Sequence, residues 1–323
     1  MNSTIFTSET AATRDGFGVG LFEAAEQDDK VYALCADLTE SMRLDKFEQL
    51  FPNRFVQMGV AEQNMIGVAA GLALAGKTPF ATSFAVFSPG RTLDQIRVSV
   101  AYSNLNVKIV GGHTGLSTGP DGATHQALED IAIMRTLPNM TVICPSDAQQ
   151  AREATVALAS HQGPAYLRLS RPKYPILKHQ KPFVIGEAEI LKEGNDLTLI
   201  SFGDAIHDCL LAAQSLGKRG VSVQIINLHT IKPIDKKALV QAANKTKRII
   251  TVEDHQVTGG LGSAVAEVLL PEINQSVTNE FKFLMIGVND SFGESGEDCE
   301  LKKKYGIDVD SIVKKSINLL AKY

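Results

Sequence analysis

One carboxylate stands in a stretch of small and apolar residues, GVAEQNMIGVAAGLALAG (59–76). The spacing of these residues predicts a tightly packed helix with Glu62 in its first turn. The helix dipole favours an ionised carboxylate there, whereas burial among apolar groups raises a carboxyl pKa and favours the neutral acid. A carboxyl group that stays protonated near neutral pH can donate a proton. Glu62 is therefore a candidate catalytic acid, and the simpler alternative is that it caps its helix.

The densest polar segment is the loop GGHTGLSTGPDGATHQALED (111–130), which follows an apolar stretch and contains five glycines. We expect a strand before it and a helix that begins near Thr124 after it, so the loop lies at a strand end, where ligands bind in open α/β sheets. Its polar side chains are His113, Ser117, Thr118, Asp121, Thr124 and His125. Two imidazoles with a carboxylate between them suit a polyhydroxylated or phosphorylated ligand. The alternatives are a metal site formed by His113, Asp121 and His125, or ordinary surface and core residues.

Two phenylalanines, Phe84 and Phe87, end another predicted strand in the segment SFAVFSPGR (83–91). Phenylalanine in an α/β protein is usually a core residue. An aromatic face at a strand end can also stack on a flat heterocycle. Because the chain contains no Trp, an aromatic cofactor would have to pack against Phe or Tyr.

Further polar residues also lie just beyond predicted strands or open the first predicted helix. Arg14 opens that helix, Asp37 and Ser41 follow the strand at 31–35, and Arg171 follows the strand at 165–170. The planar guanidinium of arginine bonds two phosphate oxygens at once, so these residues could hold a phosphate. Each could equally be a solvated surface residue.

Short apolar runs alternate with helical periodicity along the whole chain, which predicts parallel strands with helices on both faces. We expect strands at 31–35, 79–84, 106–112, 141–145, 165–170, 197–201, 221–227 and 248–253. We expect helices near 10–28, 60–76, 89–103, 124–136, 147–160, 205–219, 235–245, 261–270 and 307–322.

A break in this pattern at RPKYPILKHQKPFVIG (171–186), with three prolines and five basic residues, indicates a linker between two domains. The predicted fold class is therefore α/β, with a first domain at 1–175, a linker at 176–190 and a second domain at 191–323. A chain of 323 residues is long enough for two such cores.

Composition excludes several classes of partner and compartment. The apolar fraction of 44%, the charged fraction of 21% and the net charge of −4 are ordinary for a globular protein and favour neither nucleic acid nor a membrane surface. Four dispersed cysteines without a CxxC pair, and a start without a signal-peptide pattern, indicate reduced thiols and a cytoplasmic protein. No Walker A motif occurs, and the glycine clusters at 16–20 and 259–262 do not follow the dinucleotide-binding pattern.

In this order along the chain, several motifs resemble the C-terminal half of transketolase. They are GVAEQN (59–64), DGATHQ (121–126) and LSR (169–171), with TR (13–14) and DLTES (37–41) in support. The chain is similar over nearly its whole length to the second subunit of a split, two-chain transketolase. The resemblance implies a pyrimidine-binding domain followed by the transketolase C-terminal domain.

The resemblance also implies thiamine diphosphate and a partner chain. The family's GDG…N motif, which holds the diphosphate through a divalent metal, is missing here. Its nearest approximation, Gly203-Asp204-Ala205, lies in the wrong half and lacks the Asn. A partner subunit should therefore carry the diphosphate and Mg²⁺, with the cofactor across the interface, and the family's paired sites suggest two copies of each chain (α2β2).

Site residues follow from the resemblance position by position. Glu62 matches the glutamate that hydrogen-bonds the pyrimidine ring nitrogen. Phe84 and Phe87 match the aromatic residues around the pyrimidine, and Asp37 with Leu38 matches a segment close to the cofactor. His113 and Asp121 match residues that bind hydroxyls of the donor sugar, and His125 matches the second histidine of that loop. Arg14, Ser41 and Arg171 match the clamp for the sugar phosphate.

The reaction implied is transfer of a two-carbon ketol unit from a ketose, phosphorylated in this interpretation, to an aldose, with histidines moving protons. The chain departs from the family at Pro120, where Glu is frequent, and at SPGR (88–91), which lacks a tyrosine and leaves the role of Arg91 open. A sulfonated or branched sugar phosphate would need similar cations. Alternatives are the β subunit of a 2-oxoacid dehydrogenase and a non-catalytic stabilising subunit, and deoxyxylulose-phosphate synthase is a further relative.

Overall fold

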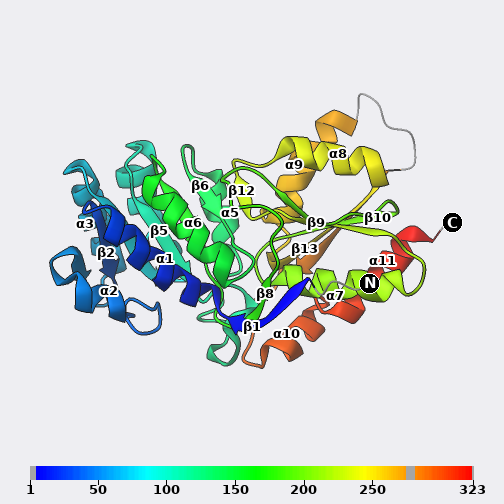
Figure 1. Cartoon of the computed structure of the whole chain (residues 1–323), viewed down its shortest axis with the longest axis horizontal. Coiled ribbons are helices and arrows are strands. Elements are labelled where there is room, and N and C mark those ends of the chain that lie inside the picture. The colour runs from blue at the N-terminus through cyan, green and yellow to red at the C-terminus, as the bar shows by residue number, and fades with distance from the viewer. Residues whose placement is uncertain (1–4, 274–280, 322–323) are drawn as a thin grey trace.

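A computed structural model describes residues 5–273 and 281–321 of the chain (Figure 1). The first half contains β1 (Phe6–Ala11), α1 (Thr13–Gln27), β2 (Val31–Cys35), α2 (Asp45–Leu50), η1 (Pro52–Arg54), β3 (Phe55–Gln57), α3 (Glu62–Leu74), β4 (Thr78–Phe84), α4 (Leu93–Gln95), η2 (Ile96–Tyr102), β5 (Lys108–Gly112), η3 (Leu116–Asp121), α5 (Asp130–Thr136), β6 (Thr141–Ile143), α6 (Ala148–Ser160), β7 (Ala165–Arg168) and β8 (Tyr174–Leu177).

The second half, from β9 onward, contains β9 (Glu189–Lys192), β10 (Leu197–Ser201), α7 (Ala205–Gly217), β11 (Val223–Asn227), β12 (Thr230–Lys232), α8 (Lys236–Thr246), β13 (Arg248–Gln256), α9 (Leu261–Ile273), β14 (Lys282–Val288), α10 (Asp298–Tyr305) and α11 (Val309–Leu320).

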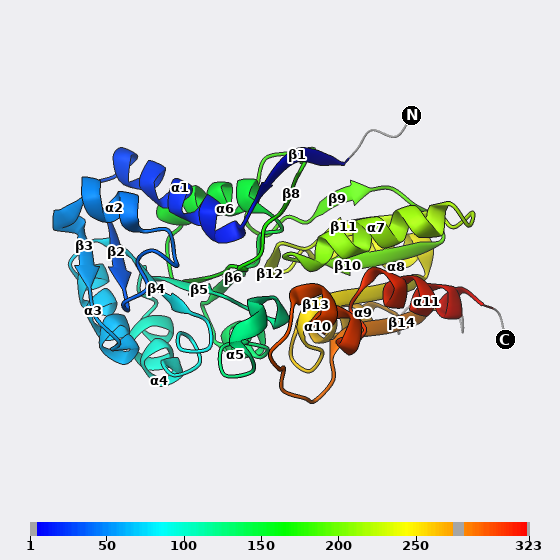
Figure 2. The same cartoon turned by 90° about the horizontal axis from the view of Figure 1, so that it is seen from below.

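The first sheet has the strand order β12-β6-β7-β5-β4-β2-β3. All neighbouring pairs from β6 to β3 are parallel, and β12 joins the edge antiparallel to β6. Helices α1 and α6 lie on one face of this sheet, and α3, α4 and α5 lie on the other (Figure 2). With both faces covered, strand β4 is buried along its whole length, including the polar residues Thr78, Thr82 and Ser83.

Helices α1 and α6 pack closely because glycine lines their contact. A Cβ atom on Gly16 would lie 1.9 Å from the carbonyl oxygen of Ala148, and one on Gly20 would lie 2.6 Å from that of Arg152. The backbones can approach this closely only without a side chain at these positions. This contact fixes α1, whose first turn carries Arg14, against the sheet.

The second sheet has the order β14-β13-β10-β11-β9, parallel except for β9. Helices α8 and α9 lie on one side of it, and α7 and α11 lie on the other (Figure 1). Its strands are rich in Ile, Val and Leu, and β10 and β11 are buried throughout. The predicted α/β fold class, a parallel sheet with helices on both faces followed by a second α/β sheet, is confirmed.

Two features join the two halves, and a separate ribbon lies between them. Strand β12 belongs by sequence to the second half but pairs with the first sheet, and β1 pairs with β8 in a separate two-stranded ribbon between the halves (Figure 2). One apolar cluster contains buried residues of both halves, among them Ile131, Met134, Leu239 and Leu261. The two halves are therefore packed together through an apolar core, and the segment expected to be a linker includes β8.

One predicted helix starts in the wrong place, and one helix near the C-terminus was missed. The chain after the loop does not become helical near Thr124, because α5 begins only at Asp130. The last helix, expected over 307–322, is confirmed as α11, but the preceding helix α10 was missed, and Gly306 in the left-handed region (φ 69°) separates the two. An αL glycine is a typical helix C-cap, so it separates the two helices.

The packing of α3 differs from the expectation on one face. Met65, Ile66 and Ala69 are fully buried, as predicted. On the opposite face, a Cβ on Gly67 or Gly71 would meet no other atom within 4 Å, and Leu74 is 75% exposed. The small residues thus leave one face of the helix open.

The state of the cysteines and the length of the helices bear on the expected class of protein. All four cysteines lie in the described part of the chain and are free thiols, with Cys299 exposed and the others buried. Within residues 5–273 and 281–321, every helix is too short or too polar to cross a membrane.

Candidate active site

The predicted site residues meet at one edge of the first sheet. Strands β7, β5, β4 and β2 are neighbours and run parallel, so their carboxyl ends share this edge. Asp37 follows β2, Phe84 ends β4, His113 follows β5 and Arg171 follows β7. The expectation that ligand-binding residues gather at strand ends therefore agrees with the topology.

Glu62 lies at the start of α3, and its side chain is only 3% exposed. Its Oε2 atom is 2.8 Å from Nη1 of Arg91, with which it forms an ion pair. The guanidinium of Arg91 also lies over the ring of Phe87, 5.0 Å from the ring centroid, in a cation–π contact. Glu62 therefore has a charged partner, not the purely apolar surroundings that its sequence context suggests, and Arg91 connects it to the aromatic residues.

Two phenylalanines and two histidines form a cluster of rings beside this ion pair. The rings of Phe84 and Phe87 are stacked with centroids 6.3 Å apart. The His113 ring lies 3.8 Å from Phe84, and the His125 ring meets Phe87 edge-on at 5.5 Å. The two predicted histidines of the loop thus reach the two predicted aromatics, which gives the site an apolar wall with polar nitrogen atoms at its margin.

His113 carries a neutral ring. Burial, followed by the charges of Arg14 and Arg171, lowers the pKa of His113 to about 3. Its Nε2 atom is 3.4 Å from Nη1 of Arg14, and because a guanidinium only donates, Nε2 must accept and the proton must sit on Nδ1. Nδ1 is buried and has no hydrogen-bond partner within the described residues. The ring therefore presents a buried N–H donor suited to a ligand oxygen.

Three arginines surround His113 and make this end of the site cationic. Nη1 of Arg14 donates to the carbonyl oxygen of Ser41 at 2.9 Å, and burial together with the charge of Arg43 lowers the pKa of Arg14. Nη1 of Arg171 donates to the carbonyl oxygen of Thr118 at 2.8 Å and to Asp121 at 3.2 Å. Neighbouring positive charges that lower one another's pKa in this way favour an anionic ligand, as the phosphate interpretation requires.

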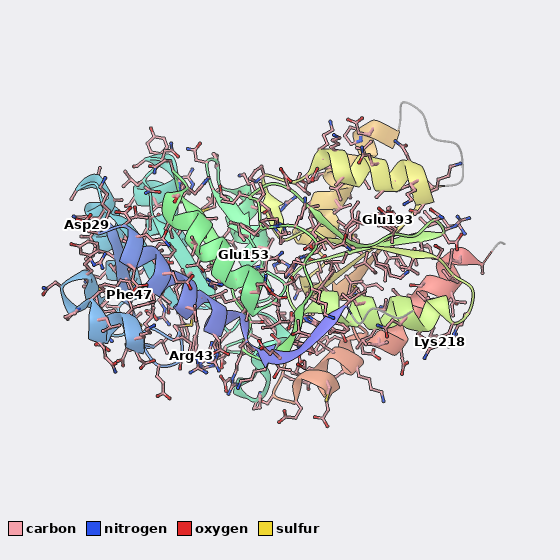
Figure 3. The ribbon with its side chains drawn as sticks, viewed as in Figure 1. Asp29, Arg43, Phe47, Glu153, Glu193 and Lys218 are labelled. Carbon is pink, nitrogen blue, oxygen red and sulfur yellow. The ribbon has the colours of Figure 1, made fainter. Side chains whose placement is uncertain are left out.

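Arg43 was not among the predicted site residues. It lies beside α1, where its Nε atom donates to Asp15 at 2.7 Å (Figure 3). Its charge nevertheless contributes to the lowered pKa of both Arg14 and His113. Arg91 was noticed in the sequence, but its pairing with Glu62 was missed because 29 residues separate the two.

Asp37 and Leu38 lie at the same edge, just after β2. The side chain of Asp37 is exposed, and its backbone N–H donates to the side-chain oxygen of Gln57 at 2.9 Å. Leu38 packs against the apolar cluster that contains Phe84. Asp37 and His113 both have positive φ angles, 60° and 52°, which are costly for residues other than glycine and are often found at functional sites.

The loop after β5 is held by turns instead of a helix. Leu116–Asp121 forms the 3₁₀ segment η3, flanked by Gly115 and Gly122 at φ angles of 71° and 77°. These left-handed conformations suit glycine and let the chain reverse direction on both sides of η3. The chain then returns to form an isolated bridge between Thr114 and Ala127 before α5 begins. This closed loop is the physical reason that no helix begins near Thr124.

The residues at this edge of the first sheet fit the pyrimidine part of the expected thiamine diphosphate. A buried carboxylate beside stacked phenylalanines and a buried unpaired imidazole N–H suit a flat, nitrogen-containing ring and a hydroxylated substrate. In the part of the chain that the structure describes, no group of three or more His, Cys, Asp or Glu side chains is arranged to hold a metal, so the metal-site alternative is not supported. Asp204 of the Gly203-Asp204-Ala205 segment is buried before α7 in the second half, not at this edge.

Family models match both halves of the chain. The transketolase pyrimidine-binding domain matches residues 9–176, and the transketolase C-terminal domain matches residues 186–312. Together these matches span most of the chain.

Several similar proteins are named as parts of a transketolase. The chain is 44% identical to the transketolase C-terminal section of Methanocaldococcus jannaschii, over 96% of each chain. It is 42% identical to the 6-deoxy-6-sulfo-D-fructose transketolase subunit SqwH of Clostridium sp. (strain MSTE9), over 93% of this chain and 92% of the relative. It is 37% identical to a subunit of the apulose-4-phosphate transketolase of Phocaeicola vulgatus, over 96% of this chain and 98% of the relative.

A solved structure agrees with these relatives. It is described as a split-gene transketolase in the form of an inactive β4 tetramer, and it is 42% identical to this chain. It superposes with a TM-score of 0.86 over 96% of this chain and 98% of the other. These names favour ketol transfer over the 2-oxoacid dehydrogenase alternative.

Proposed function

The chain belongs to the transketolase family of transferases, and we propose that it is the second subunit of a two-chain transketolase that is active only with its partner. One observation carries the proposal: the contacts run without a break from Glu62 through Arg91, Phe87 and Phe84 to His113 and Arg14. This series places a buried carboxylate, an aromatic wall and a cationic end along one sheet edge. The family depends on thiamine diphosphate, whose pyrimidine ring fits the carboxylate and the aromatic wall.

We assign the first domain to residues 1–175, the linker to 176–190 and the second domain to 191–323. The family-model matches at 9–176 and 186–312 support this division. The first domain then contains all of the proposed site residues, and the second domain follows the β1–β8 ribbon.

The proposed roles follow from the positions of the side chains. When bound, thiamine diphosphate supplies the nucleophilic carbon and the electron sink for ketol transfer. Glu62 would hold a proton at the pyrimidine ring nitrogen, while Phe84 and Phe87 would pack against that ring and Asp37 with Leu38 would close its edge. His113, His125 and Asp121 would bind hydroxyl groups of the donor sugar and move protons. Arg14, Ser41 and Arg171 would bind its phosphate.

A partner subunit is proposed because this chain supplies only part of the cofactor site. Its described residues contain no group of three or more His, Cys, Asp or Glu side chains that could hold the metal of the diphosphate. We infer that a chain with a GDG…N motif holds the diphosphate and Mg²⁺ and assembles with this one as α2β2. The names of the similar proteins, a C-terminal section, a transketolase subunit and an inactive tetramer of β chains, support this division of labour.

The donor is proposed to be a phosphorylated ketose, because Arg14, Arg43 and Arg171 lie around His113. The similar proteins from Clostridium sp. and P. vulgatus are named for a sulfonated and a branched sugar. Both sugars carry an anionic group, so the cationic end of the site is compatible with either. The anion is thus the shared feature, and the carbon skeleton distinguishes the donors.

Reconstitution tests the proposal. The purified chain is assayed alone and with a GDG-bearing transketolase subunit, thiamine diphosphate and Mg²⁺, using xylulose 5-phosphate, 6-deoxy-6-sulfo-D-fructose and apulose 4-phosphate as donors and a panel of aldose phosphates as acceptors. We expect no ketol transfer by the chain alone and transfer with the partner. Full activity of the isolated chain would refute the two-chain proposal. Turnover that survives Glu62→Gln would support the stabilising-subunit alternative.

A further inference from the structure

The loop that carries His113 and His125 rests on a buried carboxylate from the second half. Asp254 lies near the end of β13, and it is 1% exposed. Its Oδ1 atom accepts a hydrogen bond from the backbone N–H of Leu116 at 2.8 Å, and its Oδ2 atom accepts one from Ser117 at 3.2 Å. These two amides open η3, so one side chain of the second half accepts bonds from both of its first residues.

The loop is shaped to admit this carboxylate. Gly115 has a φ angle of 71°, and a Cβ atom there would lie 2.0 Å from Oδ2 of Asp254. Any other residue at this position would therefore both strain the backbone and collide with the carboxylate. The absence of a side chain at Gly115 is thus what allows Asp254 to reach the amides.

A second contact from the same half holds the far end of the loop. Nε2 of Gln126 donates to the carbonyl oxygen of Glu294 at 2.9 Å and to that of Gly119 at 3.3 Å. A Cβ on Gly293 would lie 1.9 Å from Oε1 of Gln126, which shows how closely this segment packs on the loop. The second half therefore contacts the loop on both sides of Asp121.

Asp254 is itself held in place by the first sheet. Nη2 of Arg168, at the end of β7, donates to the carbonyl oxygen of Asp254 at 2.9 Å. The same guanidinium pairs through Nε with the buried Asp130 at 2.9 Å. Burial raises the pKa of Asp254 to about 7, with the charge of Arg168 and the Leu116 amide acting in the opposite direction. The free-energy cost of burying this carboxylate is offset by the loop amides and by the charge of Arg168.

On its other side, the loop faces the candidate site. Oγ1 of Thr118 donates to the carbonyl oxygen of His113 at 2.7 Å, and Arg171 donates to the carbonyl oxygen of Thr118 at 2.8 Å. The segment η3 thus lies between Asp254 and Arg171. A shift of η3 would move Asp121 and change the backbone support of His113.

We propose that Asp254 is a positioning residue through which the second half sets the position of the substrate loop. Its side chain accepts hydrogen bonds from the backbone amides of Leu116 and Ser117, and it acts by fixing these amides. That the loop binds a sugar rests on the proposed function, whereas the support of the loop by Asp254 does not. The second half then contributes to substrate affinity although all of the proposed binding residues lie in the first half.

The test compares Asp254→Asn with a matched control, Asp235→Asn. Asp235 also accepts two backbone N–H bonds at 2.9 Å each, from Ala238 in α8 and from Ala188 just before β9, and neither amide belongs to the loop. Hydrogen–deuterium exchange of the full chain is measured for the segment 115–122. We expect exchange about tenfold faster or more in Asp254→Asn, as for loss of one hydrogen bond to a charged group, and no change in Asp235→Asn.

Kinetics of the reconstituted enzyme supply the second measurement. Asp254→Asn should raise the KM for the donor by about tenfold with a kcat change of less than about threefold, since η3 carries the donor-binding Asp121 whereas the two proton-moving histidines lie outside η3. Gly115→Ala perturbs the same contact from the loop side and should change exchange and KM in the same direction, which covers the case in which Asp254→Asn does not fold. Unchanged exchange and unchanged KM in the folded variants would overturn the proposal. If the wild-type complex transfers no ketol group, the proposed function fails, and the exchange measurement still decides the role of Asp254.

Discussion

The two sheets of this protein both place charged residues near the carboxyl ends of parallel strands, but they use them differently. At the first sheet, Asp37 and Arg171 are wholly or partly exposed, and the buried His113 lies at the same edge. At the second sheet, Glu253, Asp254 and His255 lie near the end of β13 and are all buried. Position at a strand end is therefore insufficient to identify a ligand site, because the side chains must also remain available to a ligand.

Two buried glutamates make the difference specific. Glu62 is paired with the half-exposed side chain of Arg91 beside two aromatic rings. Glu253 instead accepts the backbone N–H groups of Leu261 at 2.6 Å and Gly262 at 2.9 Å, at the start of α9. Burial raises the pKa of Glu253 to about 8, although these amides act against the rise. The partner of Glu62 is thus a half-exposed side chain, whereas the partners of Glu253 are backbone amides.

The largest expected effect is on catalysis by Glu62. In the reconstituted enzyme, Glu62→Gln should lower kcat by about 10²- to 10⁴-fold, the usual contribution of a positioned proton donor or acceptor, with little change in Tm. Turnover assays and thermal unfolding of the same preparation measure both quantities. Wild-type turnover in this variant would contradict a catalytic role for Glu62.

Glu253→Gln should have the opposite effect, on stability and not on turnover. Its amide group would face one of the two backbone donors, so we expect a lower Tm and near-normal turnover per folded molecule. If Glu253→Gln removed turnover without loss of stability, the second edge would also have a functional role.

The next effect concerns the cationic end of the first edge. Arg171→Gln should raise the KM for a phosphorylated donor by about ten- to a hundredfold, because it removes a charge-assisted hydrogen bond. Arg152→Gln is the matched control, since Arg152 is half exposed on α6 and pairs with Glu23 instead. Its KM should stay within about twofold of the wild-type value. Equal effects of the two substitutions would contradict the assignment of an anion site to this edge.

The smallest effect tests how the two halves are joined. His179 lies between Asp147 of the first half, at 3.0 Å, and Glu189 of the second, at 2.8 Å. Burial alone would lower the pKa of His179, but the hydrogen bonds and charges of these carboxylates outweigh it and raise the pKa to about 10. A pKa raised by folding stabilises the protein fully below the ordinary value of about 6.5, and this contribution is lost as the pH rises from about 6.5 towards 10.

Urea unfolding between about pH 6 and 9.5 measures that contribution. The wild type should be more stable than His179→Gln at the acidic end, and this difference in the free energy of unfolding should shrink as the pH rises. His229→Gln is the control, because burial lowers the pKa of His229 to about 4, so its contribution has the opposite sign and is complete soon above the ordinary value of about 6.5. An identical pH dependence in wild type and His179→Gln would show that this pair of ion pairs does not stabilise the junction.

Much of this architecture is local and was predicted from the sequence. The strands at 31–35 and 197–201 were predicted with the bounds that the structure has, because uninterrupted apolar runs between breaks are typical of parallel strands. Strands β1, β3, β8, β9, β12 and β14 were missed. For β1, β8 and β12 the reason is that each depends on a partner far along the chain: β1 pairs with β8, and β12 pairs with β6. The expected helix near Thr124 was wrong because a glycine-bounded loop closes there.

The sequence by itself determined which residue types reach the first edge, because successive parallel strands bring their carboxyl ends together and the loops that follow must meet there. It placed Glu62 in the first turn of a helix and the two histidines in one loop. Only the tertiary structure decided which of these groups remain available. The pairing of Glu62 with Arg91 and of the loop amides with Asp254 spans 29 and 138 residues, respectively. The reason is physical: burial and hydrogen bonding of a polar group depend on neighbours brought close by packing, and residue spacing along the chain does not specify those neighbours.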